Sequence, residues 1–130
     1  HARMTLDGML NADFEHNDLF LVYQPVIDFR NGDVSYVETL VRWRQSDGRI
    51  LMPDSFIRVA EKSGQIKQLS EWVILTACGE LAAMHATAPG LRAGINLSMH
   101  NLHDFYLMAK ILASLDEYQL QPESLLLEIT

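Results

Sequence analysis

The sequence has a single cysteine, Cys78, and few basic residues. One cysteine excludes an internal disulfide framework, and its place in an apolar helical pattern predicts a small buried side chain. Ten lysines and arginines against 17 aspartates and glutamates give a formal charge of −7. This acidic balance argues against a protein that binds the phosphate backbone of nucleic-acid polymers. It still allows a small anionic ligand that arginines and metal ions hold together.

Long hydrophobic runs and glycine-rich phosphate loops are also missing. The longest apolar run, residues 72–78, is far shorter than the roughly 20 residues that a membrane-spanning helix needs. No secretory signal is visible, so we expect a cytoplasmic protein or the cytoplasmic part of a larger, membrane-attached one. No G-x-G-x-x-G or Walker sequence is present. The apolar fraction of 48% is high enough for a folded core in one domain or a piece of one.

Three apolar segments predict strands that each present an oxygen-bearing side chain on a polar face. In the first segment, alternation places Glu38 and Arg42 on one face and Thr39 on the other. Asn96 and Glu128 hold similar positions in the second and third. A solvated surface strand would explain any one of these segments, but the recurrence favours a site where parallel strands converge. The segments are residues 33–43, 91–98 and 124–130.

The remaining pattern predicts how these strands are connected. Asn31-Gly32 follows a predicted strand at residues 20–29 and predicts a hairpin with a type I′ turn, in which both residues have positive φ. The first two strands should therefore be antiparallel. Alternating strands and helices indicate an α/β fold with parallel units, and polar strand ends favour a (β/α)₈ barrel over an open doubly wound sheet. Helices are expected at residues 54–62, 65–86 and 101–118.

Five motifs occur at characteristic intervals from residue 19 to the end of the chain. They are Tyr23-Gln24-Pro25-Val26, Glu38-Thr39-Leu40-Val41-Arg42-Trp43, Pro53-x-x-Phe56-Ile57-x-x-Ala60-Glu61-x-x-Gly64, Asn96-Leu97-Ser98 and Leu127-Glu128-Ile129-Thr130. In this order the motifs resemble the EAL-domain family of bacterial cyclic di-GMP phosphodiesterases. The resemblance implies a TIM-like (β/α)₈ barrel whose first strand is antiparallel to the second, in agreement with the hairpin predicted above.

The resemblance also implies an activity and a site. Members of the family hydrolyse cyclic di-GMP to pGpG with Mg²⁺ or Mn²⁺. By resemblance, Glu38, Asn96 and Glu128 would be metal ligands, and Gln24 and Arg42 would contact the dinucleotide. Oxygen donors suit these hard cations, and a planar guanidinium suits a phosphate. Strand geometry would separate Glu38 from Arg42 by roughly 13 Å, too far for a salt bridge between them.

The sequence departs from the family in two ways. Thr39 stands where the family usually has alanine; because it falls on the face opposite Glu38, we expect it to pack against a helix and be tolerated. A complete barrel takes about 200 to 250 residues. We therefore expect residues 19–130 to be the N-terminal half of an EAL-type barrel, truncated after about half of its length, and residues 1–18 to be a lead-in helix or linker.

The expected truncation affects activity. The family's next acidic pair and lysine are absent, so we expect this chain alone to be inactive, although its parent would be a cyclic-guanylate-specific phosphodiesterase. The missing half-barrel or a second copy, in a homodimer, would then cover the last strand. The alternative is a catalytically silent EAL-like module that binds cyclic di-GMP or a protein partner; the retained metal ligands favour the enzyme.

Two other groups have simpler interpretations. His100 and His103 have a spacing that could bind zinc, but no third ligand is evident, and a solvated helix start explains them better. Glu61 is expected to fix its own loop and to have no catalytic role.

Overall fold

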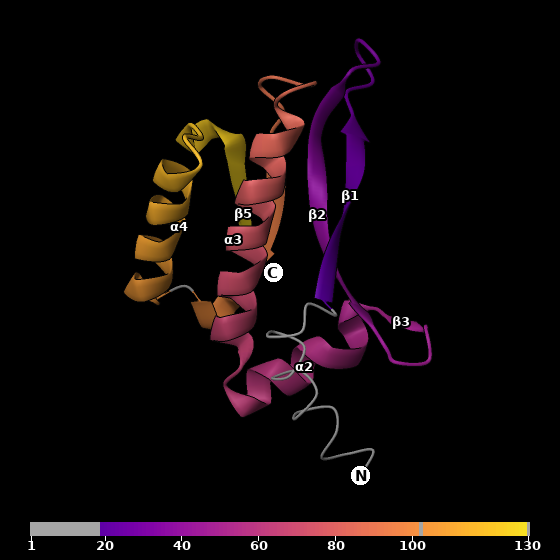
Figure 1. Cartoon of the computed structure of the whole chain (residues 1–130), viewed down its shortest axis with the longest axis vertical. Helices are drawn as coiled ribbons and strands as arrows, with labels where there is room; N and C mark the ends of the chain where they lie inside the picture. Colours follow the sequence, from indigo (N-terminus) through magenta and orange to yellow (C-terminus); the bar gives the residue numbers. More distant parts are fainter. Residues whose placement is uncertain (1–18, 102, 130) are drawn as a thin grey trace.

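The computed structural model describes residues 19–101 and 103–129 of the chain. Five strands form one sheet in the order β1-β2-β4-β5, and the short β3 pairs with β2 (Figure 1). The strands are β1 (Leu19–Ile27), β2 (Val34–Arg44), β3 (Ile50–Leu51), β4 (Ala93–Leu97) and β5 (Leu125–Ile129). The α-helices are α2 (Pro53–Ser63), α3 (Ile66–Met84) and α4 (Phe105–Glu117), with short 3₁₀ turns at Met99–Asn101 and Pro122–Ser124.

The strand directions confirm the predicted α/β fold. β1 is antiparallel to β2, whereas β2, β4 and β5 run parallel to one another. Helices α2 and α3 connect β2 and β3 to β4, and α4 connects β4 to β5, as in successive βα units. The sheet does not close on itself within the described residues, so it has the form of a partial barrel.

The hairpin between β1 and β2 forms as predicted, but its turn is not type I′. Gly32 has a φ of +75°, whereas Asn31 is not among the described residues with positive φ. The backbone carbonyl of Asp28 accepts hydrogen bonds from the N–H groups of both Asn31 and Gly32, at 3.3 and 2.8 Å. The Asp28 carboxylate also accepts from the Arg30 N–H at 2.9 Å. These bonds stabilise a longer loop in which only glycine needs the left-handed conformation.

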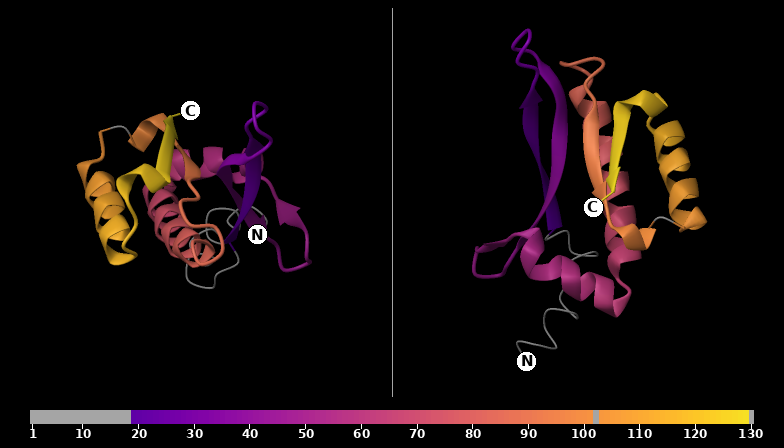
Figure 2. Two further views of the ribbon diagram at one scale, coloured as in Figure 1. Left: turned by 90° about the horizontal axis from the view of Figure 1, so that it is seen from above. Right: turned by 180° about the vertical axis from the view of Figure 1, so that it is seen from behind.

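One face of the sheet is covered by helices and contains the core. α3 and α4 lie against this face, and the view from behind shows the other face without a covering helix among the described residues (Figure 2). Trp43 is fully buried and meets Phe56 of α2 edge to face, with ring centroids 5.6 Å apart. Val37 and Thr39, at alternate positions of the same strand, are buried too, so the predicted assignment of β2 residues to the two faces is confirmed. Cys78 is buried as predicted, and burial raises the pKa of its thiol to about 11.

Local signals explain where the helices begin and end. Pro53 starts α2, and Gly64 ends it with a φ of +82°. Asp104 caps α4 by accepting a hydrogen bond from the Leu107 N–H at 3.1 Å, so this helix begins at Phe105 and not at the predicted residue 101. No pattern predicted the two-residue β3. The predicted lead-in at residues 1–18 lies outside the described residues.

No helix in residues 19–101 or 103–129 is both long and apolar enough to cross a membrane.

Candidate metal and phosphate site

The three predicted metal ligands lie on the open face of three adjacent parallel strands. Glu38 on β2 is in register with Gly94 on β4, and Asn96, two residues further along β4, is in register with Glu128 on β5. Residues in register on parallel strands point to the same face, and neighbouring strands lie about 4.8 Å apart. The sheet therefore brings together two carboxylates and one amide from positions up to 90 residues apart, since 128 − 38 = 90.

Gly94 allows the side chains around it to approach closely. A Cβ atom at this position would lie 3.2 Å from the Cε2 atom of the Tyr36 ring and 3.4 Å from the Oε1 atom of Glu128. A larger residue would therefore crowd these two side chains, whereas the φ of Gly94 is not in the left-handed region and would allow one. The sequence placed Gly94 on the polar face but gave no sign of this role, because Tyr36 and Glu128 come from the two neighbouring strands.

One oxygen of this group has no hydrogen-bond partner in the described part of the chain. Oε1 of Glu128 is buried, and no donor among the described residues reaches it. An unpaired buried carboxylate oxygen is unfavourable unless a cation or a donor compensates for it. Two carboxylates and an amide oxygen are suitable ligands for Mg²⁺ or Mn²⁺. The donor set and the unpaired oxygen therefore fit a divalent cation.

Gln24 and Arg42, the predicted dinucleotide contacts, lie on the same open face. Gln24 is exposed on β1 and in register with Glu38, so these two side chains are neighbours across the hairpin. Arg42 lies near the end of β2, where its Nη1 donates a hydrogen bond to the Val41 carbonyl at 2.8 Å. Among the described residues no ion pair joins Glu38 to Arg42, which the spacing along the strand predicted. The guanidinium therefore keeps donors for another acceptor.

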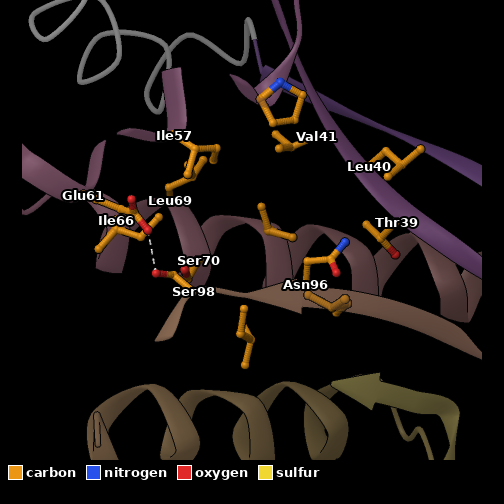
Figure 3. A pocket seen from close by; sticks show the side chains of 14 residues that line it. Thr39, Leu40, Val41, Ile57, Glu61, Ile66, Leu69, Ser70, Asn96 and Ser98 are labelled. Carbon is orange, nitrogen blue, oxygen red and sulfur yellow. Dashed lines mark hydrogen bonds between the residues drawn. The ribbon is translucent and has the colours of Figure 1, made fainter. Parts of the chain in front are cut away.

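A cavity of about 380 Å³ adjoins Asn96, where β2 and β4 separate. The strands are paired from Val37 to Thr39 on β2, and beyond that point β2 diverges. Thr39 is buried on the face opposite Glu38, as predicted, but it also borders this cavity (Figure 3). Its Oγ1 atom is buried and has no hydrogen-bond partner among the described residues.

Glu61 does more than fix its own loop. The hydroxyl of Ser98 donates a hydrogen bond to Oε2 of Glu61 at 2.7 Å, which joins α2 to the segment after β4 across 37 positions of sequence (Figure 3). Sequence reasoning missed this contact because neither residue lies in a periodic pattern that relates them. One signal for this contact was present in the sequence: each of the two residues lies in one of the five motifs.

The predicted zinc site is not supported by the described side chains. His103 is exposed, and within the described residues no three His, Cys, Asp or Glu side chains come together as a metal site. The side chain of His100 lies outside what the structure describes. The set of Glu38, Asn96 and Glu128 includes an amide and so is a different kind of group.

Comparisons with known proteins agree with these features. The sequence model of the EAL domain matches residues 7–130. The chain is 34% identical over 128 residues to the cyclic di-GMP phosphodiesterase NbdA of Pseudomonas aeruginosa, covering 98% of this chain and 16% of that protein. It superposes on the phosphodiesterase PaMucR, solved as a cyclic di-GMP complex, with a TM-score of 0.88 and 30% identity, covering 95% of this chain and 50% of that one. For the FimX EAL domain of P. aeruginosa bound to cyclic di-GMP, the TM-score is 0.84 and the identity 28%, covering 95% and 49% of the two chains.

Proposed function

Because the chain belongs to the EAL domain family, we propose that it forms one wall of the active site of a cyclic di-GMP phosphodiesterase. The reaction would add water across one phosphodiester bond of cyclic di-GMP and release linear pGpG. The chain spans 16% of the length of NbdA and half of the PaMucR chain, so the activity is proposed for the whole protein.

The observation that chiefly supports this function is the register of β2, β4 and β5. It brings Glu38, Asn96 and Glu128 to one face, where the buried Oε1 of Glu128 lacks a partner among the described residues. We propose that these three residues hold Mg²⁺ or Mn²⁺. When bound, such ions supply Lewis-acid stabilisation of charge on the phosphoryl oxygens and lower the pKa of a water molecule.

Gln24 and Arg42 would bind and orient the dinucleotide. Arg42 is half-buried near the end of β2, so its guanidinium is positioned by the sheet more firmly than a surface arginine would be. A guanidinium can bind a phosphate through two parallel hydrogen bonds, which fixes the direction of the phosphodiester relative to the carboxylates. Gln24, opposite Glu38 on β1, offers amide donors and acceptors at the edge of the same face.

Hydrolysis by the purified full-length protein would test this proposal. We expect the release of pGpG, measured by chromatography, to require Mg²⁺ or Mn²⁺ and to be abolished by excess chelator. Glu128→Gln removes the charge of the proposed ligand with little change of shape and should lower the rate at least about a hundredfold. Glu117→Gln is the matched control, because Glu117 is exposed at the end of α4.

The alternative function is a silent module that binds cyclic di-GMP without hydrolysing it. The FimX EAL domain, which has the same fold, is solved bound to cyclic di-GMP, so binding of the dinucleotide is a property that the alternative shares with the enzyme. Calorimetric titration with cyclic di-GMP, with and without Mn²⁺, separates the two functions. Binding without pGpG release in either condition would support the silent module and contradict the enzyme.

A further inference from the structure

Within residues 19–101 and 103–129, the end of β4 that presents Asn96 has a paired strand on one side and none on the other. Pairing between β2 and β4 covers Val37 to Thr39 on one strand and Ala93 to Ile95 on the other. Asn96 and Leu97 continue to pair with β5, but on the other side the cavity of about 380 Å³ separates them from β2. A strand that is paired on one side is held less firmly than a strand inside a sheet.

Side-chain hydrogen bonds from Ser98 and Asn101 hold the segment that follows. Ser98 donates to the Glu61 carboxylate of α2 at 2.7 Å, and the side-chain amide of Asn101 donates to the hydroxyl of Ser70 on α3 at 2.8 Å. The second bond is buried, and Asn101 has almost no exposed surface. Both α2 and α3 are therefore joined to the four residues 98–101 that follow β4, and Figure 3 shows the bond to α2.

We propose that Glu61, acting through Ser98, is a positioning residue that fixes Asn96 as a metal ligand. The inference rests on the proposed function, because it assigns Asn96 the role of ligand. Ser98 is two residues from Asn96, so the bond to Glu61 restrains the backbone that sets the direction of the amide oxygen. A hydroxyl that donates to a carboxylate forms a stronger bond than one between neutral groups. The hydrogen bond from α2 thus restrains this end of β4, where β2 no longer pairs with it.

The residue type at position 61 follows from this role. α2 ends at Ser63, and Gly64 then reverses the chain in the left-handed conformation. Glu61 lies in the last turn of the helix, where its side chain is long enough to cross the edge of the cavity to Ser98. A shorter carboxylate at position 61 would not reach Ser98 without movement of α2.

The test compares Glu61→Ala, Glu61→Gln and Ser98→Ala in the full-length protein. We expect Glu61→Ala and Ser98→Ala each to raise the Mn²⁺ concentration for half-maximal hydrolysis about tenfold, as outer-shell substitutions do. The KM for cyclic di-GMP should stay unchanged, because Gln24 and Arg42 are untouched. Glu61→Gln keeps an acceptor for the Ser98 hydroxyl, so its Mn²⁺ concentration for half-maximal hydrolysis should stay close to that of the wild type. The Glu61→Ala/Ser98→Ala double variant should be no worse than either single variant.

A matched control uses a second bond of the same chemistry elsewhere. The Tyr23 hydroxyl donates to the Glu80 carboxylate at 2.6 Å and so joins β1 to the C-terminal half of α3, without involving α2 or the segment after β4. Glu80→Ala breaks a hydroxyl–carboxylate bond of similar length, and the Mn²⁺ requirement should remain that of the wild type. An equal rise in Glu80→Ala and Glu61→Ala would overturn the proposal, because the effect would then be general destabilisation.

Amide hydrogen exchange separates failure of this inference from failure of the proposed function. In the metal-free protein, Glu61→Ala should accelerate exchange at residues 96–98 at least tenfold and leave residues 93–95 unchanged. A wild-type protein without metal-dependent hydrolysis would contradict the proposed function, whatever the exchange shows. Unchanged exchange at residues 96–98 together with an unchanged Mn²⁺ requirement in Glu61→Ala would overturn the positioning role.

Discussion

The two faces of the sheet differ in what their side chains do, although the same strands supply both. On the helix-covered face, Val37, Trp43 and Ile95 are buried in the core. On the open face, Glu38 is half-buried and Asn96 is exposed, on the same two strands and one residue away from core positions. Because side chains alternate along a strand, a residue that stabilises the core is followed directly by one that faces the candidate site. Substitutions on one face should change the free energy of unfolding, and those on the other should change hydrolysis.

Glu38→Ala should have the largest effect on hydrolysis. We expect the rate of pGpG release by the full-length protein to fall about a thousandfold, or roughly 4 kcal/mol of barrier, because a proposed metal ligand is lost. The free energy of unfolding should change by less than about 0.5 kcal/mol, since no core contact is removed. Rate and urea unfolding should be measured on the same preparations. A loss of stability above about 2 kcal/mol would contradict the inference that residues on the open face contribute little to the free energy of unfolding.

Trp43→Ala tests the covered face. Trp43 is fully buried against Phe56, so its truncation should cost about 3–5 kcal/mol of unfolding free energy. Urea unfolding can be followed through the fluorescence of Trp72, which the variant keeps. Phe29→Ala is the control, because Phe29 is 98% exposed at the hairpin tip and should change stability by less than about 0.5 kcal/mol. Equal effects of the two substitutions would contradict the assignment of the core.

Gly94→Ala tests how tightly the open face is packed. The added methyl group would meet the Tyr36 ring at 3.2 Å and the Glu128 carboxylate at 3.4 Å. We expect the Mn²⁺ requirement to rise about tenfold and stability to fall by about 1–2 kcal/mol. Adding Tyr36→Leu should relieve the contact and recover part of the Mn²⁺ affinity. If the double variant were worse than Gly94→Ala alone, steric displacement by Tyr36 would not be the cause.

Arg42→Lys should have a smaller effect, confined to substrate binding. A lysine keeps the charge but loses the planar pair of donors, so the KM for cyclic di-GMP should rise about tenfold with the Mn²⁺ requirement unchanged. Arg44→Lys is the matched control: Arg44 is exposed, and its guanidinium lies 4.5 Å from the centroid of the Phe20 ring. A similar rise of KM in both variants would point to a general electrostatic effect.

Thr39→Val should have the smallest effect and tests the boundary between the faces. The buried Oγ1 of Thr39 has no hydrogen-bond partner among the described residues, so an isosteric methyl group should stabilise the protein by up to about 1 kcal/mol. Thr39→Ala should stay within about 1 kcal/mol of the wild type, with hydrolysis within twofold for both variants. A tenfold change of hydrolysis in either variant would show that position 39 reaches the site through the cavity.

Sequence reasoning predicted the features that depend on local periodicity and missed those that depend on tertiary contacts. Alternation was sufficient to assign Glu38 and Trp43 to opposite faces. The Asn31-Gly32 pair predicted the hairpin but not its turn, because the Asp28 carboxylate selects a longer loop. The close packing around Gly94 and the bond from Glu61 to Ser98 depend on residues from neighbouring elements, whose distances no local pattern encodes.

The antiparallel start of the sheet has a consequence for the order in which the site is assembled. β1 and β2 are joined by a short loop, so Gln24, Glu38 and Arg42 are brought together by contacts that are local in the chain. Local contacts form early, because closing a short loop costs little entropy. During synthesis this hairpin emerges from the ribosome before Asn96 and Glu128 have been added. We expect Gln24, Arg42 and the first proposed metal ligand, Glu38, to be arranged first, and β4 and β5 to add Asn96 and Glu128 later.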